Sequence, residues 1–89
     1  MGAVSETIRR KLNAAFAPER LEVVDDSDKH KGHAGAREGG ESHFSITVVS
    51  ASFASVGRVE RQRRINAALA EELAGPVHAL SIKALAVGE

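Results

Sequence analysis

The chain contains the run Phe44-Ser45-Ile46-Thr47-Val48-Val49, in which large apolar residues occupy every second position. This period of two predicts a strand with one buried face. Upstream, the run Leu21-Glu22-Val23-Val24-Asp25 is short and rich in β-branched residues, which also favours a strand. Glycine and charged residues dominate the stretch from about 26 to 41 between the two. We therefore expect these strands to pair in antiparallel fashion around a long, flexible loop.

Two helices and a third strand are predicted on either side of this pair. Apolar residues four apart predict a helix over residues 3–16, which Pro18 brings to an end. A second helix is predicted over residues 58–73, where Ile65, Leu69 and Leu73 form an apolar ridge. The glycine–proline pair at 75–76 is typical of a helix end. The pattern of residues 77–85 indicates the third strand.

The predicted order is therefore α-β-β-α-β, within a single domain that spans residues 1–89. This order favours an α+β fold of two layers, with the helices on one face of a three-stranded sheet. The last connection contains a helix, so we expect a mixed sheet in which the third strand runs parallel to one neighbour.

The composition limits the classes of function. Twelve basic residues balance twelve acidic ones, which argues against a dedicated DNA-binding module, since these are usually basic. The chain has no cysteine, so it forms neither a disulfide nor an all-cysteine iron–sulfur site by itself. Hydrolase and nucleotide-binding motifs are absent from the sequence, and we do not expect an enzyme. We expect a cytoplasmic protein without membrane contact, because no signal or spanning segment is evident.

The four histidines are candidate metal ligands, since imidazole binds iron, zinc and copper. His30 and His33 lie in the glycine-rich loop, His43 follows that loop, and His78 stands far away in the sequence. Each also has a plain structural interpretation: solvated loop residues for the first two, and a backbone-satisfied strand residue for His78. For His43 we favour a structural role, in which it either ties the base of the loop or lines the site.

Four arginines crowd the first half of the second predicted helix. They are Arg58, Arg61, Arg63 and Arg64. Arg61 and Arg64 lie three apart and are expected to share one face of the helix. That face is either simply solvated or binds a partner, protein or nucleic acid.

Several short motifs, in order along nearly the whole chain, resemble the BolA family. The motifs are Asp25-Asp26-Ser27-x-x-His30, Glu41-Ser42-His43-Phe44, Val49-Ser50-x-x-Phe53, Arg61-Gln62-Arg63, Leu69-x-x-Glu72-Leu73 and Val77-His78-Ala79-Leu80. One departure is Gln62, where family members usually carry histidine.

The resemblance implies a class II KH-like topology and a monothiol glutaredoxin of the Cys-Gly-Phe-Ser type as partner. It also implies a [2Fe-2S] cluster shared with the glutaredoxin cysteine and glutathione, and no cofactor in the isolated protein, which we expect to be a monomer. His78 and His30 are the ligands implied for this chain, with His33 as the alternative loop ligand. Such a protein would serve cluster assembly, cluster trafficking or iron sensing. The alternative that the resemblance implies is a DNA-binding transcriptional regulator of stress response and cell morphology.

Overall fold

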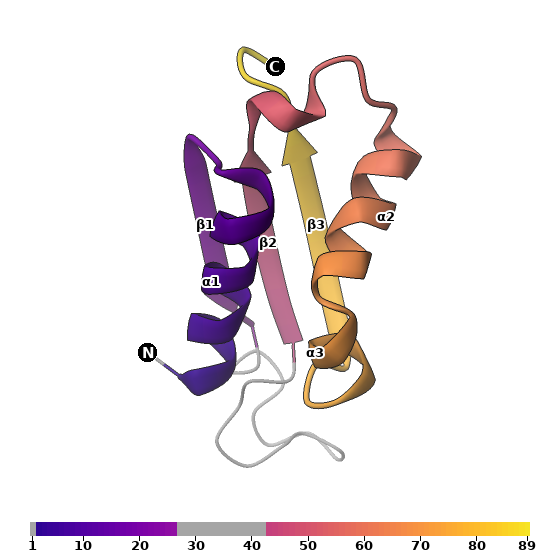
Figure 1. Cartoon of the computed structure of the whole chain (residues 1–89). Helices are drawn as coiled ribbons and strands as arrows, with labels where there is room; N and C mark the ends of the chain where they lie inside the picture. The colour runs from indigo at the N-terminus through magenta and orange to yellow at the C-terminus, as the bar shows by residue number, and fades with distance from the viewer. Residues whose placement is uncertain (1, 27–42) are drawn as a thin grey trace.

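The computed structural model describes residues 2–26 and 43–89. These residues form two layers, with the helices packed on one face of a three-stranded sheet (Figure 1). The order of the elements is α-β-β-α-β, apart from two short helical pieces described below. The predicted fold class is confirmed.

The sheet has the order β1-β2-β3, with β2 at its centre. The strands are β1 (Arg20–Asp25), β2 (His43–Val49) and β3 (Ala79–Leu85). β1 pairs antiparallel to β2, and β3 pairs parallel to β2. Both pairings agree with the predictions, although β3 begins two residues later than expected. As a result, His78 precedes the strand instead of lying within it.

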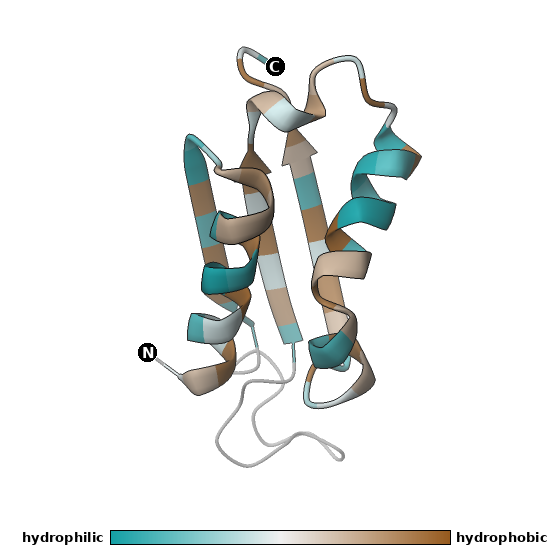
Figure 2. Ribbon diagram, in the orientation of Figure 1, coloured by the Kyte–Doolittle hydropathy of each residue, from teal (hydrophilic) through white to brown (hydrophobic). Residues whose placement is uncertain are grey.

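The central strand explains why the helices cover only one face. Phe44, Ile46 and Val48 are buried against the helices, whereas the intervening residues of β2 are partly exposed on the other face. Figure 2 shows the corresponding alternation of brown and lighter bands along the strands. The period-two pattern of the sequence therefore places the hydrophobic core between the sheet and the helices.

The first helix, α1 (Ala3–Phe16), has the predicted bounds. Ile8, Leu12 and Phe16 form its buried stripe against the sheet. The helix ends at Ala17, whose backbone adopts the left-handed conformation with φ 44°. The following Pro18 cannot continue the helix, as expected.

The second predicted helix is interrupted, which corrects the prediction of one helix over residues 58–73. The structure has α2 (Arg58–Ala68) and a short α3 (Ala70–Ala74), separated by Leu69 at φ −107° and ψ 20°. Hydrogen bonds still cross the interruption, because Leu69 N–H donates to Ile65 and Leu73 N–H donates to Leu69. Leu69 is itself buried in the core, at the point where the two helices meet.

The connection from β2 to α2 completes the core. It contains the short 3-10 helix η2 (Ala51–Phe53), and the Phe53 ring lies 5.1 Å from that of Phe16 between ring centroids. Ser50 Oγ donates to the Phe16 carbonyl oxygen at 2.6 Å, which satisfies the end of α1. This buried contact joins the end of β2 to the first helix.

Candidate functional site

His78 is held by its neighbours in the chain. The Val77 side chain is buried, and the Val77 N–H donates to the Glu72 carbonyl oxygen at 2.9 Å. The Glu72 carboxylate, in turn, accepts hydrogen bonds from Lys11 Nζ at 3.0 and 2.9 Å. The backbone before His78 is thus fixed to α3 and α1, while the His78 side chain is exposed. A fixed backbone and an exposed imidazole are suited to binding something outside the chain.

His43 lies beside His78. It is the first residue of β2, and in the parallel pairing it stands opposite Ala79, the residue that follows His78. The two imidazole rings are stacked, with centroids 6.5 Å apart and planes inclined by 25°. The sequence predicts that His43 ties the base of the loop or lines the site. The structure adds that it lies next to His78, which only the register of the parallel strands could reveal.

The two ends of the glycine-rich segment meet at this same end of the sheet. Asp26 N–H donates to the His43 carbonyl oxygen at 2.7 Å, and the Ser45 hydroxyl donates to the Asp26 carboxylate. Residues 27–42 are therefore joined to the sheet at the end where β3 begins. His30 and His33 lie outside the described residues, so their predicted ligand role stays a prediction.

The described ranges 2–26 and 43–89 contain no group of three or more histidine, cysteine, aspartate or glutamate side chains that could hold a metal ion. His78 and His43 together offer at most two imidazoles, and the chain has no thiol. Metal sites in proteins commonly need about four protein or exogenous ligands. Any iron held here would therefore need ligands from elsewhere.

Arg61 is not part of an exposed arginine face, which corrects the expectation that it shares such a face with Arg64. It is only 7% exposed. Its Nε donates to the Val56 carbonyl oxygen at 2.8 Å, and its Nη1 donates to the Ala84 carbonyl oxygen at 3.1 Å. The guanidinium also binds both carboxylate oxygens of Glu89, at 2.6 and 3.0 Å. This side chain fastens α2 to β3 and to the residues that follow it.

The other three arginines of α2 are exposed. Arg64 makes an ion pair with Glu60 at 3.4 Å, one turn earlier in the helix. Arg58 and Arg63 also reach solvent. Exposed ion pairs of this kind add little stability, so these side chains are available to a partner.

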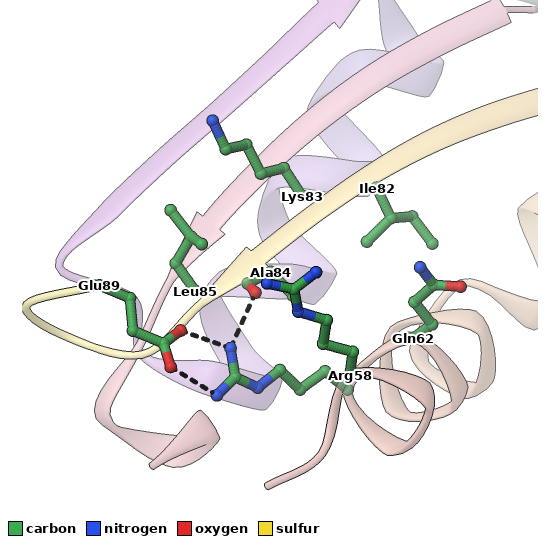
Figure 3. Close-up of a pocket in the computed structure, with 8 residues that line it drawn as sticks. Arg58, Gln62, Ile82, Lys83, Ala84, Leu85 and Glu89 are labelled. Atoms are coloured by element: carbon green, nitrogen blue, oxygen red, sulfur yellow. Dashed lines mark hydrogen bonds and ion pairs between the residues drawn. The ribbon is translucent and has the colours of Figure 1, made fainter.

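Arg58 lines a cavity of about 520 Å³ between α2 and β3. Figure 3 shows its side chain extending from α2 toward β3, with Gln62 facing Ile82 across the cavity. The bidentate pair of Arg61 and Glu89 borders the same cavity, at the end of β3 distant from His78. No local sequence pattern predicts this cavity, because Glu89 follows the last predicted strand and its contact with Arg61 is long-range.

The ion pair of Arg61 and Glu89 shifts the pKa of the Glu89 carboxyl. The bidentate Arg61 guanidinium, together with the N–H of Ala86, lowers the pKa of the Glu89 carboxyl from 4.5 to about 2. Lys11 at the other end of the molecule has a raised pKa, because its ammonium donates hydrogen bonds to the carboxylates of Glu72 and Glu71.

The sequence model of a protein family, described as BolA-like protein, matches residues 12–89 of the chain. The chain belongs to the BolA family. BolA-like protein 1 of Pongo abelii is 50% identical over 84 residues, which cover 94% of this chain and 58% of that relative. The DNA-binding transcriptional regulator BolA of Escherichia coli (strain K12) is 43% identical, covering 97% of this chain and 78% of the regulator.

The fold agrees with this BolA assignment. The BolA domain of SufE1 from Arabidopsis thaliana superimposes with a TM-score of 0.85 at 39% identity, covering 98% of this chain and 95% of that one. The chain spans a little over half the length of the mammalian BolA-like proteins that it matches. Within the described residues, no helix is both long enough and apolar enough to cross a bilayer.

Proposed function

We propose that this BolA-family chain is a partner of a monothiol glutaredoxin of the Cys-Gly-Phe-Ser type and co-ligates a [2Fe-2S] cluster between the two proteins. One observation supports this most directly. The exposed His78 lies at the end of the sheet where the segment that contains His30 and His33 begins and ends. Two histidine sources that are distant in the sequence are thereby attached to one end of the fold.

The donor set of the chain fits a shared cluster better than one of its own. A [2Fe-2S] cluster takes four protein or thiolate ligands, and this chain offers imidazoles without any thiol. With His78 and His30 as ligands, and His33 as the alternative in the loop, two positions are left. The glutaredoxin cysteine and a bound glutathione would fill them.

The role of the chain in this proposal is to present and orient nitrogen ligands. The hydrogen bond from Val77 to Glu72, with Lys11 behind it, holds the backbone next to His78 in place. Histidine in place of thiolate raises the reduction potential of a cluster, which suits assembly, delivery or iron sensing. The proposal assigns no catalytic residue, and it takes the isolated chain to be a cytoplasmic monomer without a bound cofactor.

The test is reconstitution of the pure chain with a Cys-Gly-Phe-Ser glutaredoxin, iron, sulfide and glutathione, followed by visible absorption and circular dichroism. We expect a mixed complex whose spectrum differs from that of the glutaredoxin homodimer. His78→Ala should remove this difference, and His78→Cys should restore a complex with a shifted spectrum, because thiolate is also a ligand.

Lys83→Ala is the matched control, since Lys83 is exposed on β3, the strand that follows His78, and lies five residues further along the chain. His30→Ala and His33→Ala, examined in parallel, identify the loop ligand. An unchanged spectrum for His78→Ala in a complex that still forms would contradict the ligand assignment.

A second candidate function is DNA-binding regulation of transcription, linked to stress response and cell morphology. Relatives from Escherichia coli and Vibrio cholerae bear the name of a DNA-binding transcriptional regulator, at 43% and 44% identity. The exposed Arg58, Arg63 and Arg64 on α2 supply a local basic surface within a neutral chain.

A gel-shift titration at several salt concentrations tests this second function. Arg63→Glu and Arg64→Glu, each made singly, should weaken binding and reduce its salt dependence, because each phosphate contact releases counterions. Arg10→Glu on α1 serves as a control of equal charge change, and Arg61 is left intact because it holds α2 to β3. Sequence-independent binding, or none at low salt, would remove this candidate.

A further inference from the structure

The outer edge of β3 is covered at one end only. β3 is an edge strand, since the sheet order is β1-β2-β3. Arg61 Nη1 donates to the Ala84 carbonyl oxygen, and the Ala86 N–H donates to the Glu89 carboxylate at 2.8 Å. Leu85, between them, faces the other way, because its carbonyl oxygen accepts from Ser50 N–H. The pair of Arg61 and Glu89 thus covers the last outward-facing groups of the strand.

The earlier half of this edge is open. Main-chain groups alternate in direction along a strand, so those of Leu80 and Ile82 point outward, as those of Ala84 do. Among residues 2–26 and 43–89, no hydrogen bond reaches these outward groups of Leu80 or Ile82. Exposed edge groups are a template for pairing with another strand, and proteins commonly block them when pairing is unwanted. Here the contacts of Arg61 and Glu89 that cover the edge reach back only as far as Ala84.

The cavity beside this edge has the size and charge for an occupant. Its volume of about 520 Å³ lies between Gln62 on α2 and Ile82 on β3, and binding sites for small groups usually measure about 300–1,000 Å³. Two guanidiniums, Arg58 and Arg61, stand here against the single carboxylate of Glu89. Arg61 is paired with that carboxylate, so the positive charges of Arg58 and of Lys83, which also lines the cavity, exceed the negative charge there. Figure 3 shows the Arg58 side chain extending from α2 toward β3.

We propose that an extended acidic segment of a partner protein adds to the free edge of β3 and places a carboxylate beside Arg58. Main-chain hydrogen bonds to Leu80 and Ile82 supply affinity, and the unbalanced guanidinium selects an acidic sequence. This site runs along the edge of β3 from Leu80, two residues after His78, to the cavity beside Arg58. It uses no histidine and does not rest on the cluster proposal.

Amide hydrogen exchange followed by NMR tests the proposal. The probe is an acetylated peptide of alternating valine and threonine that ends in two glutamates. In the free protein the Ile82 and Leu80 amides should exchange quickly, while those of Ser81 and Lys83, paired with β2, exchange slowly. The peptide should slow exchange at Ile82 and Leu80 and leave Ser81 and Lys83 unchanged.

Variants then test the charge preference. Arg58→Glu should weaken peptide binding about three- to tenfold, in line with the loss of one favourable charge pair. Arg63→Glu, on the same helix but outside the cavity, should leave the affinity within twofold of the parent. A peptide with lysine in place of glutamate should bind at least threefold more weakly to the parent protein.

Three results would overturn the proposal. The first is no protection of Ile82 at millimolar peptide. The second is equal binding of the lysine peptide. The third is protection that rises with protein concentration in the absence of peptide, which would show that the edge pairs with a second copy of the chain.

Discussion

Arg61 and Glu89 form a bidentate ion pair in which Nη1 lies 2.6 Å from one carboxylate oxygen and Nη2 lies 3.0 Å from the other. The pair is joined to two strand-edge groups, the Ala84 carbonyl and the Ala86 N–H. A single contact thereby connects α2, β3 and the residues after β3. Bidentate pairing with an arginine fixes geometry as well as charge, so this contact orients the second helix on the sheet.

The first prediction concerns acid unfolding. The pKa of Glu89 falls from 4.5 to about 2 in the folded protein, chiefly through the hydrogen bonds from Arg61. A carboxylate with a lowered pKa stabilises the fold fully above its unfolded pKa, and this stabilisation is lost as the pH falls. The difference in free energy of unfolding between the parent and Glu89→Gln should therefore shrink from pH 4.5 to about 2. Urea titrations at several pH values measure it, and a difference constant across this window would contradict the assignment.

The second prediction concerns the core beneath that pair. Phe53 is fully buried, packs on Phe16, and has the Arg61 guanidinium 5.9 Å from its ring centroid. Phe53→Ala should lower the free energy of unfolding by about 3–5 kcal/mol, because it leaves a cavity in a small core. Val59→Ala is the control, since Val59 is 66% exposed and should change stability by less than about 0.5 kcal/mol. Chemical denaturation measures both, and similar losses for the two variants would show that Phe53 is not central to the core.

Local patterns predicted most of the fold, and long-range contacts account for what they missed. The alternation around Phe44 and Ile46 was enough to predict a strand and its buried face, because both follow from the period of two. The central position of this strand in the sheet is known only from the structure. The bounds of the first helix, Ala3–Phe16, were also predicted correctly, since Pro18 is a local signal for a helix end. The interruption at Leu69 was not predicted, because no proline or glycine marks it in the sequence.

The candidate site was predictable only in part, for the same reason. The resemblance to the BolA family implied a ligand role for His78, and the structure places this residue at an exposed position beside the ends of the glycine-rich segment. The stacking of His43 on His78 depends on the register of two parallel strands, which no local pattern encodes. Arg61 was grouped with its exposed neighbours because helical spacing says nothing about Glu89, which lies 28 positions away.

The third prediction concerns alkaline pH. The hydrogen bonds to Glu72 and Glu71 raise the pKa of Lys11 above its usual 10.5. A base with a raised pKa stabilises the fold fully below its unfolded pKa, and this stabilisation disappears as the pH rises through the folded value. The parent should be more stable than Lys11→Met at pH 8, and the gap should narrow above pH 10.5. Thermal unfolding at several pH values measures this gap, and a gap that widens above pH 10.5 would refute the role of Lys11.

The fourth prediction links this ion pair to His78. Glu72 is buried, and its carbonyl oxygen holds the backbone just before His78, whereas Glu71 is 87% exposed. Glu72→Gln weakens the anchor to Lys11, so His78 should be presented less uniformly to a partner. In the reconstitution with the glutaredoxin, the concentration of Glu72→Gln at which half of the mixed complex forms should be higher than that of the parent by about threefold or more. Glu71→Gln should leave that midpoint unchanged. Circular dichroism in the far ultraviolet must show both variants folded, and an equal shift for both would mean that charge alone, and not the position of His78, governs the complex.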